Sequence, residues 1–302
     1  METIRTTRQL LDSGYDKGEL RRLRRSGQLT HVRRGAWTRF PLDEAAGREL
    51  RHRELIAAVV TRVSPDAVVS HVSAAVLLGL PVWSSRLRQV HLTRSRSNGA
   101  RRRPDLELHS ATLSPAHLLC IEGLAVTSLA RTVADLGRSL PFEQAVAAGD
   151  RAAALGLDFG DLDDVLHSME RWPGVAQARR VADFIDGRSE SVGESVSRVR
   201  ISEEGLPGPI PQREIHDHAG RLIARVDFYW EQFRTVGEFD GKLKYGDLLQ
   251  PGQRPADVLF KEKLREDAVR DTDRRFVRWV WEDLYTKGVL RDRLLRAFSR
   301  TR

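Results

Sequence analysis

Apolar residues recur at helical spacing near the start of the chain and predict two short helices there. Thr6 or Thr7 is placed to cap the first helix, which runs to Asp12 and is followed by a serine and a glycine. Asp16 is placed to cap the second helix, over residues 17–25, which another Ser-Gly pair ends. Two short helices joined by a tight turn form the frame of a helix-turn-helix.

The second helix carries an apolar stripe, Leu20 and Leu23, and basic residues on its other faces. Residues 29–33 and 36–40 flank a turn and predict a β-hairpin. In a winged helix-turn-helix, which has this order, the second helix enters the DNA major groove and the hairpin contacts phosphate or the minor groove. The predicted DNA-binding residues are Lys17, Arg21, Arg22, Arg24, Arg25, Arg33 and Arg34. The alternative is a small structural cap whose arginines are merely solvated.

Residues 46–186 alternate between helical and extended patterns. Expected helices cover residues 47–62, 68–78, 128–136, 142–156 and 172–186, and expected strands cover residues 90–93 and 106–109. The loop between the two strands, residues 94–104, carries arginines and is either a phosphate-binding loop or a solvated surface. His71 is expected to be a buried, hydrogen-bonded residue, because no nucleophile elbow or third partner is spaced to make it catalytic.

Three runs in the first 180 residues resemble the AbiEi-type antitoxins. They are Leu-Thr-His-Val-Arg-Arg-Gly-Ala-Trp from residue 29, Ser-His-Val-Ser-Ala-Ala-Val-Leu-Leu-Gly-Leu-Pro from residue 70, and Thr-Ser-Leu-Ala-Arg-Thr-Val-Ala-Asp-Leu from residue 127. The resemblance implies a winged helix that binds DNA and represses its own operon, in a protein that is the antitoxin of a toxin–antitoxin system. This chain departs from the pattern by starting almost at the first helix of the motif.

The last part of the chain predicts a helix, three strands, a helix, a strand and a closing helix. The helix that begins near Ser191 has one apolar stripe, formed by Val192, Val196 and Val199. Expected strands cover residues 212–216, 222–230, 235–240 and 276–281, and the later helices cover 258–270 and 289–299. The fold class is therefore α/β (α+β) and multidomain: a winged helix over 1–45, a mixed α/β domain over 46–186 and a further α/β domain over 187–302.

Three carboxylates and a lysine lie on two neighbouring predicted strands of this last domain. Asp227 alternates with apolar residues, and Glu238 and Asp240 share a face of the next strand, which Lys242 would join if the strand continued. Packed carboxylates repel each other unless a cation or a proton relieves them. The pattern therefore predicts a divalent-metal site at paired strand ends.

The same stretch resembles the PD-(D/E)XK nucleases, and is closest to the branch that includes the very-short-patch-repair endonucleases. The runs Glu-Ser-Val-Ser-Arg from 194, Gly-Leu-Pro-Gly-Pro from 205, Val-Asp-Phe-Tyr-Trp from 226 and Glu-Phe-Asp-Gly-Lys-Leu-Lys-Tyr from 238 carry this resemblance. It implies that Asp227 and Glu238 bind Mg²⁺ and that a lysine positions the attacking water. Asp240 stands where that lysine is expected. Asp240 would then be a third metal ligand, and Lys242 or Lys244 would take the role of the lysine. Glu194 is a further ligand candidate.

Composition limits the partners, the cellular compartment and the cofactors that are expected. The 302 residues carry a formal net charge of +8, which favours an acidic partner such as nucleic acid. The first residues lack an apolar signal segment, no long apolar run is present and Cys120 is the single cysteine, so a cytoplasmic protein without disulfides is expected. No glycine-rich phosphate loop or dinucleotide fingerprint is present, so no small-molecule cofactor is expected.

Three hypotheses follow. The first is a DNA-binding regulator of the AbiEi-antitoxin type, with a nuclease-like last domain that adds affinity or partner contacts. The second is a Mg²⁺-dependent endonuclease that hydrolyses phosphodiesters through Asp227, Glu238, Asp240 and Lys242. The third is an antitoxin that neutralises a toxin protein by direct contact. DNA binding leads because both the regulator and the enzyme require it, and whether the protein is an enzyme stays open.

Overall fold

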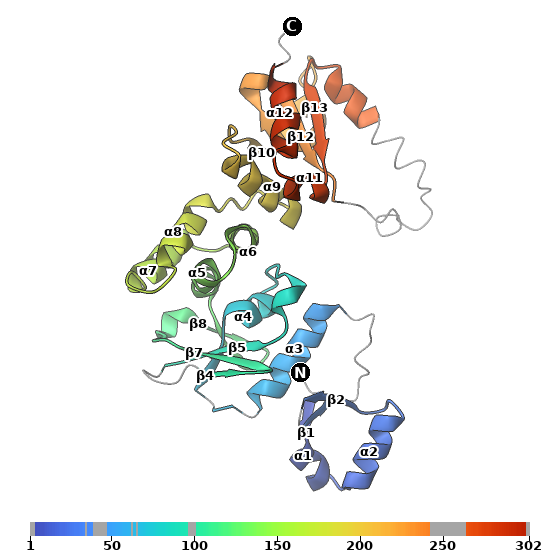
Figure 1. The fold of residues 1–302 in the computed structure, drawn as a ribbon, viewed down its shortest axis with the longest axis vertical. Coiled ribbons are helices and arrows are strands. Elements are labelled where there is room, and N and C mark those ends of the chain that lie inside the picture. Colours follow the sequence, from blue (N-terminus) through green and yellow to red (C-terminus); the bar gives the residue numbers. More distant parts are fainter. Residues whose placement is uncertain are drawn as a thin grey trace. The chain divides into compact units, whose positions relative to one another are not determined.

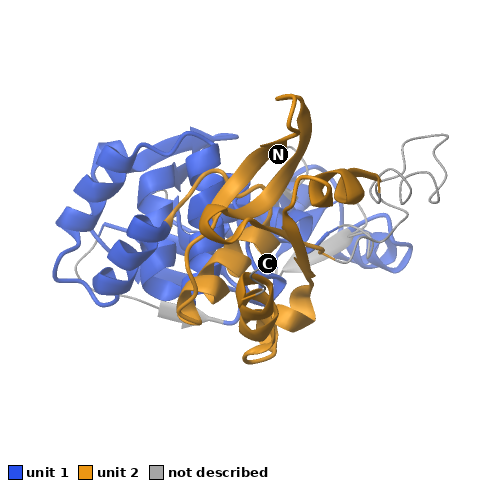
Figure 2. Ribbon diagram, turned by 90° about the horizontal axis from the view of Figure 1, so that it is seen from above, with its two compact units in different colours: residues 1–184 blue, residues 185–302 orange. Residues whose placement is uncertain are grey.

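A computed structural model describes residues 4–33, 35–38, 47–61, 63–64, 66–95, 101–241 and 264–299, and of residues 4, 30–33 and 101–103 it describes the backbone alone. The chain divides into two compact units, residues 1–184 and 185–302 (Figure 2). Both units combine helices with a β-sheet, which confirms the predicted α/β multidomain class. The predicted boundary between residues 45 and 46 stays a prediction.

The first unit opens with two helices and a three-stranded sheet (Figure 1). Its elements are β1 (Ile4–Thr6), α1 (Thr7–Asp12), α2 (Lys17–Arg25), β2 (Thr30–Arg33) and β3 (Ala36–Thr38). The strands lie in the order β1-β3-β2 and both pairings are antiparallel. Both helices use predicted caps: the Thr6 hydroxyl accepts from the Gln9 N–H, and the Asp16 carboxylate accepts from the Glu19 N–H. The strand β1 was not predicted.

A small apolar core holds this region together. Leu10 of α1, Leu20 of α2 and Leu29 are buried against one another. The Trp37 indole N–H of β3 donates to the Thr7 hydroxyl, at 2.8 Å, and so ties the hairpin to α1. Because Leu20 is the buried position of α2, the basic faces of that helix point away from the core.

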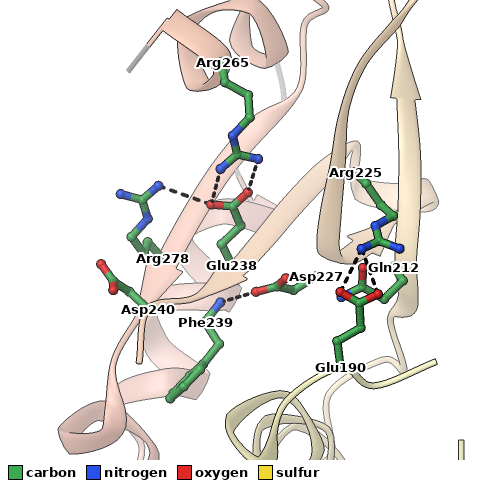
Figure 3. A pocket seen from close by; sticks show the side chains of 9 residues that line it. All are labelled: Glu190, Gln212, Arg225, Asp227, Glu238, Phe239, Asp240, Arg265 and Arg278. Atoms are coloured by element: carbon green, nitrogen blue, oxygen red, sulfur yellow. Dashed lines mark hydrogen bonds and ion pairs between the residues drawn. The ribbon is translucent and has the colours of Figure 1, made fainter. Parts of the chain in front are cut away.

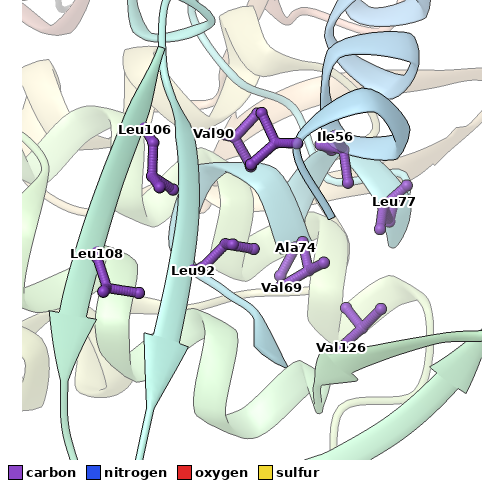
Figure 4. Packing of buried hydrophobic residues seen from close by; sticks show 10 residues of the cluster. Ile56, Val69, Ala74, Leu77, Val90, Leu92, Leu106, Leu108 and Val126 are labelled. Carbon is purple, nitrogen blue, oxygen red and sulfur yellow. The ribbon is translucent and has the colours of Figure 1, made fainter. Parts of the chain in front are cut away.

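The rest of the first unit is a six-stranded sheet followed by helices. The elements are α3 (Arg48–Val60), β4 (Ala67–Val69), α4 (His71–Leu77), β5 (Val90–Arg94), β6 (Arg101–Arg103), β7 (Leu106–Ser110), β8 (Leu118–Ile121), β9 (Leu124–Thr127), α5 (Leu129–Ser139), α6 (Phe142–Ala154), α7 (Phe159–Ser168) and α8 (Val175–Phe184). The strand order is β6-β7-β5-β4-β9-β8. Figure 4 shows the core between this sheet and its helices, where Ile56 and Ala74 meet Val69, Leu92 and Val126.

Two predictions for this sheet were wrong. Residues 68–78 do not form one helix, because Val69 pairs with Leu92 and Val126 inside the sheet and α4 starts only at His71. Residues 94–104 are not all loop, since residues 101–103 form β6 on the outer edge of the sheet. The hairpin of β8 and β9 and the helix α7 were not predicted.

The second unit has the predicted order of elements, except that a short helix, α11 (Trp281–Tyr285), which was not predicted, lies between the last strand and the closing helix (Figure 1). Its elements are α9 (Val192–Glu203), β10 (Ile210–His216), β11 (Leu222–Trp230), β12 (Thr235–Phe239), a helix over residues 264–270, β13 (Arg275–Trp279), α11 and α12 (Val289–Ser299). The sheet order is β10-β11-β12-β13; the first two pairings are antiparallel, and β12 and β13 are parallel. A parallel pair needs a crossover connection, and the 264–270 helix lies on it.

Tryptophans fill the core of this unit and restrict β12. Trp279 and Trp230 are fully buried, and the Trp279 indole N–H donates to the Ser197 hydroxyl of α9 at 2.9 Å. A Cβ atom added at Gly237 would lie 2.6 Å from the Trp279 ring and 2.9 Å from the Trp230 ring, so only glycine fits there. Trp281 was predicted as strand but begins α11, where its ring packs edge-on against Phe239.

Candidate functional site

A polar cavity lies beside β11 and β12, the strands that carry the predicted metal ligands Asp227 and Glu238. It has a volume of about 280 Å³. Figure 3 shows its lining side chains, which come from the segment just before α9, from the four strands or their ends, and from the 264–270 helix. They are Glu190, Gln212, Arg225, Asp227, Glu238, Phe239, Asp240, Arg265 and Arg278. The predicted acids Asp227, Glu238 and Asp240 therefore all line one cavity.

Asp227 has the most perturbed carboxyl group of the cavity. Its Oδ2 accepts a hydrogen bond from the Phe239 N–H at 2.9 Å, across the pairing of β11 and β12. Burial, with a smaller contribution from the nearby Glu194 and Glu238 carboxylates, raises the pKa of Asp227 to about 7, although the hydrogen bond from the Phe239 N–H acts to lower it. Near neutral pH this carboxyl group therefore exchanges between its neutral and its ionised form.

Glu238 is buried and already neutralised. Its Oε1 lies 2.8 Å from Nη1 of Arg265 and its Oε2 lies 3.0 Å from Nη2, so the guanidinium grips both oxygens. Arg278 donates a further hydrogen bond to Oε2 at 3.2 Å. Arg278 faces Glu238 because β12 and β13 pair in parallel with these two residues opposite each other.

Glu194 lies at the start of α9, where it closes the first turn. Its Oε1 accepts from the Ser191 hydroxyl at 2.7 Å, and its Oε2 accepts from the Glu190 N–H at 3.0 Å and from the Gln212 side-chain amide at 2.8 Å. Gln212 also lines the cavity, which connects Glu194 to it. Ser191 is the N-cap of α9, and the predicted ligand Glu194 thus has a structural role, because its carboxylate accepts from the cap hydroxyl and from the Glu190 N–H.

Asp240 is placed differently from the other acids. Its backbone N–H donates to the Trp279 carbonyl at 2.8 Å. In Figure 3 its carboxylate lies away from that of Asp227, with the Phe239 backbone between them. In the described residues, no group of three or more His, Cys, Asp or Glu side chains is arranged to hold a metal ion. Lys242 and Lys244 lie outside the described residues.

Carboxylate oxygens are the ligands that Mg²⁺ and Mn²⁺ prefer, so the donor chemistry of Asp227 and Glu238 suits such an ion. The raised pKa of Asp227 marks a charge that a cation would relieve. The ion pairs of Glu238 with Arg265 and Arg278 compete with that role.

The sequence did not predict four residues of this cavity: Arg265, Arg278, Arg225 and Gln212. Arg278 had a visible signal, since it alternates with the buried Val277 and Trp279 and so points to the other face of β13.

Five of the seven predicted DNA-binding residues lie on the outer faces of α2. Their side chains are exposed, and Arg22 lies 3.8 Å from Glu19 one turn earlier. The exposed set is Lys17, Arg21, Arg22, Arg24 and Arg25. For Arg33 the structure gives only the backbone position in β2, and Arg34 lies outside the described residues.

A second polar cluster is buried in the first unit. His71 is buried, as predicted, with its Nδ1 3.0 Å from the Ser70 hydroxyl and its ring stacked on His109. Burial and the neighbouring His109 and His91 rings lower the pKa of His71 well below its usual value, so the ring is neutral. Beneath it, Arg131 and Asp135 of α5 form a fully buried ion pair at 3.0 Å. This cluster is a core network and not an open site.

The structure is that of an α/β multidomain protein with an exposed basic helix, α2, in its first unit and a cavity lined by acids and arginines in its second. None of the described helices combines the length and apolarity that a membrane crossing requires. The chain is 29% identical over 206 residues to two uncharacterized proteins of Mycobacterium tuberculosis, MT2308 of strain CDC 1551 / Oshkosh and Rv2248 of strain H37Rv, and the match covers 68% of this chain and 73% of each relative. A crystal structure of the RV2827C protein from Mycobacterium tuberculosis matches 71% of this chain and 84% of its own, with 16% identity and a TM-score of 0.40. No protein-family model matches the chain.

Proposed function

We propose that this protein binds double-stranded DNA through its N-terminal helix-turn-helix, with α2 as the recognition helix. The observation that carries the proposal is the division of α2 into a buried Leu20 side and exposed cationic faces. An α-helix with its side chains is about 10–12 Å in diameter and therefore fits a major groove about 12 Å wide. The β2–β3 hairpin follows α2 directly in the chain, in the order expected of a winged helix-turn-helix, which supports the proposal.

The chemistry of the helix supports phosphate contact as well as base contact. Arginine binds phosphate and the guanine edge with two parallel hydrogen bonds, and α2 carries four arginines beside Lys17. The resemblance to AbiEi-type antitoxins supplies the biological setting of the proposal, a cytoplasmic regulator that represses its own operon beside a toxin gene. In that setting a cognate toxin protein is the second partner.

Replacing Arg21, Arg22, Arg24 and Arg25 together with alanine is expected to lower the affinity for a 25-base-pair duplex at least about tenfold. The logarithmic salt slope should become shallower by about 2–4 units, because each lost phosphate contact releases one counterion fewer. Fluorescence anisotropy between 50 and 200 mM salt, in the style of a counterion-release analysis, measures both quantities. Alanine preserves the helix and leaves the Leu20 core untouched.

A charge-matched variant provides the control. Alanine at the exposed arginines Arg151, Arg171, Arg179 and Arg291 removes the same charge outside α2 and should change the affinity less than about twofold if contact is local. Equal losses in both variants would mean that net charge alone binds DNA, and the assignment of α2 would be withdrawn.

A second candidate function rests on the cavity of the second unit. There the order α9, β10, β11, β12, helix, β13 carries Asp227 and Glu238 on neighbouring strands, in the arrangement that the resemblance to PD-(D/E)XK nucleases implies. In this candidate Asp227 and Glu238 would hold a Mg²⁺ ion, and the ion would supply Lewis-acid chemistry for the hydrolysis of a phosphodiester. Gln212 and the cavity arginines would orient the phosphate, and Phe239 N–H fixes the Asp227 carboxylate.

Cleavage tests this candidate directly. The wild-type protein with Mg²⁺ or Mn²⁺ is expected to cut at least one of supercoiled, linear and single-stranded DNA, and Asp227→Ala and Glu238→Ala are expected to lose that activity. Asp240→Asn serves as the comparison, because Asp240 lies apart from Asp227 and its loss should cost less. If the wild type cuts none of these substrates, or the two alanine variants cut equally well, the second unit is a binding module.

A further inference from the structure

The strand β8, at one edge of the six-stranded sheet, differs from the other edge strands that the structure describes (Figure 1). The edges of the three sheets are β1 and β2, β6 and β8, and β10 and β13. Every one of these strands except β8 contains an arginine, and β6 is Arg-Arg-Arg. β8 is Leu-Leu-Cys-Ile and carries no charge. Charged side chains keep an edge strand from pairing with another chain, so β8 alone among the described edges lacks this protection.

The apolar side chains of β8 are incompletely covered. Leu119 is 44% exposed, and Cys120 is exposed as well. Leu119 pairs with Val126 of β9 and therefore lies on the same face of the sheet as that core residue. The apolar face of the sheet thus continues to the outer edge and ends there at a leucine that is open to solvent.

The turn between β8 and β9 determines which backbone groups of β8 point outward. The two turn residues, Glu122 and Gly123, have φ of +51° and +79°, the signs of a type I′ turn. The residues that flank such a turn form a hydrogen-bonded pair, and bonded and non-bonded pairs alternate along an antiparallel ladder. Ile121 and Leu119 therefore bond to β9, and the backbone groups of the two residues that alternate with them point to the open side.

Cys120 carries the backbone groups that an added strand can use. Its N–H and C=O point away from β9, as do those of Leu118, but the Leu118 N–H donates to the Pro115 carbonyl. A strand that adds antiparallel to β8 therefore exchanges its pair of hydrogen bonds with Cys120. A second β8 offers the same outward N–H and C=O at its own Cys120, so two copies of this strand are self-complementary about a two-fold axis.

We propose that β8 is a self-association surface, at which β8 of a second copy of this chain adds antiparallel and continues the sheet from one chain into the other. With the two Cys120 residues opposite each other, Leu119 lies opposite Ile121 of the second copy, and the exposed leucine gains an apolar neighbour. An uncharged strand has nothing to attract a partner that is selected by charge. A second β8 matches it both in its hydrogen-bonding groups and in its apolar side chains.

The size of the contact sets the expected strength. Two paired strands of four residues form less than a standard interface, which buries about 1,200–2,000 Å². We therefore expect a dimer that dissociates in the micromolar range. Self-association does not depend on DNA binding, but a dimer would carry two copies of α2, and helix-turn-helix dimers read two half-sites of DNA.

The test is sedimentation equilibrium on the full chain without DNA, at concentrations up to several hundred micromolar. Leu119→Lys is expected to weaken dimerisation at least about tenfold, because it places a charge opposite Ile121 of the other copy, twice in each dimer. Leu155→Lys is the matched control. Leu155 is 43% exposed at the end of α6 in the same unit, so this variant adds the same charge away from β8 and should change the affinity less than about twofold.

The single cysteine supplies an independent measurement in the unmutated chain. The proposed pairing brings the two Cys120 Cα atoms to about 5.5 Å, the spacing of a hydrogen-bonded antiparallel pair. A short bismaleimide, which joins two thiols without an oxidant, should therefore give a covalent dimer of the wild type and of Leu155→Lys. Leu119→Lys should give much less of this product, and Cys120→Ser none.

Either of two results would overturn the proposal. One is a wild type that stays monomeric at several hundred micromolar and forms no crosslinked dimer. The other is a Leu119→Lys protein that dimerises and crosslinks as well as the wild type, which would place the dimer contact elsewhere. Should Leu119→Lys unfold, as circular dichroism would show, Cys120→Lys tests the same strand, since it sets two charges against each other at the two-fold axis. Because DNA is absent, neither result bears on the proposed role of α2.

Discussion

Replacing Asp227 with asparagine is expected to stabilise the second unit at pH 8 by roughly 2–4 kcal/mol, and to change its stability little at pH 4. The pKa of Asp227 is raised to about 7 by burial, whereas an unfolded aspartate titrates near 3.8. The folded state therefore binds the proton more tightly, and the contribution of Asp227 to stability falls as the pH rises from about 4 to about 7. Asparagine is neutral at every pH, and its Oδ1 still accepts from the Phe239 N–H.

Urea unfolding at several pH values, followed by hydrogen exchange in β11 and β12, measures this difference. Asp217→Asn is the control of opposite sign, because hydrogen bonds from the Arg221 backbone and side chain lower the pKa of Asp217. Its stabilisation is present above the unfolded pKa and is lost as the pH falls, so this variant should weaken the protein at pH 8 and not at pH 3. An Asp227→Asn protein no more stable than wild type at pH 8 would show that the carboxyl group is well solvated.

Replacing Arg131 with methionine is expected to destabilise the first unit by about 3–5 kcal/mol. Arg131 is 1% exposed and its Nε donates to Asp135, which is fully buried. Its Nη1 donates to the Thr112 carbonyl at 3.2 Å, and its guanidinium lies over the Trp172 ring. Methionine keeps much of the volume but leaves the buried Asp135 with only the more distant Arg138, at 3.5 Å, and His71, at 3.9 Å.

The loss should show as a melting temperature about 10 °C lower, with faster hydrogen exchange in α5. Burial already raises the pKa of Asp135, and removal of Arg131 raises it further, so the loss should be larger at pH 8 than at pH 4. The double variant Arg131→Met, Asp135→Leu removes both charges and should recover much of the loss. A double variant as unstable as the sum of the two single ones would contradict the ion-pair explanation.

Local signals predicted the helix ends well. Asp16 caps the start of α2, and Gly27, with a φ of +73°, follows its end. Both ends of that helix can therefore be predicted from residues next to them in the sequence. β1 was missed because three residues carry too short a pattern and owe their pairing to β3, some thirty residues later. Val69 was misassigned for the same reason, since its partners Leu92 and Val126 are remote in sequence.

In the candidate site too, local pattern predicted some residues, and others depend on contacts that are remote in the sequence. Alternation along the predicted strands found Asp227 and Glu238, because the direction of a side chain follows from its place in a strand. It did not find the arginine grip, since the register of the parallel pair of β12 and β13 places Arg278 opposite Glu238 and depends on a connection of more than thirty residues. Arg265 is a helix residue whose partner only the tertiary packing selects.

Gly237 also decides which way its neighbour Glu238 points. A slip of β12 by one residue against β11 would bring a side chain to the place where the Trp230 and Trp279 rings leave no room for a Cβ atom. The same slip would turn Glu238 out of the cavity and toward the tryptophans. The two indole rings therefore fix the register of β12: the strand can pair with β11 only in the alignment that turns Glu238 toward Arg265.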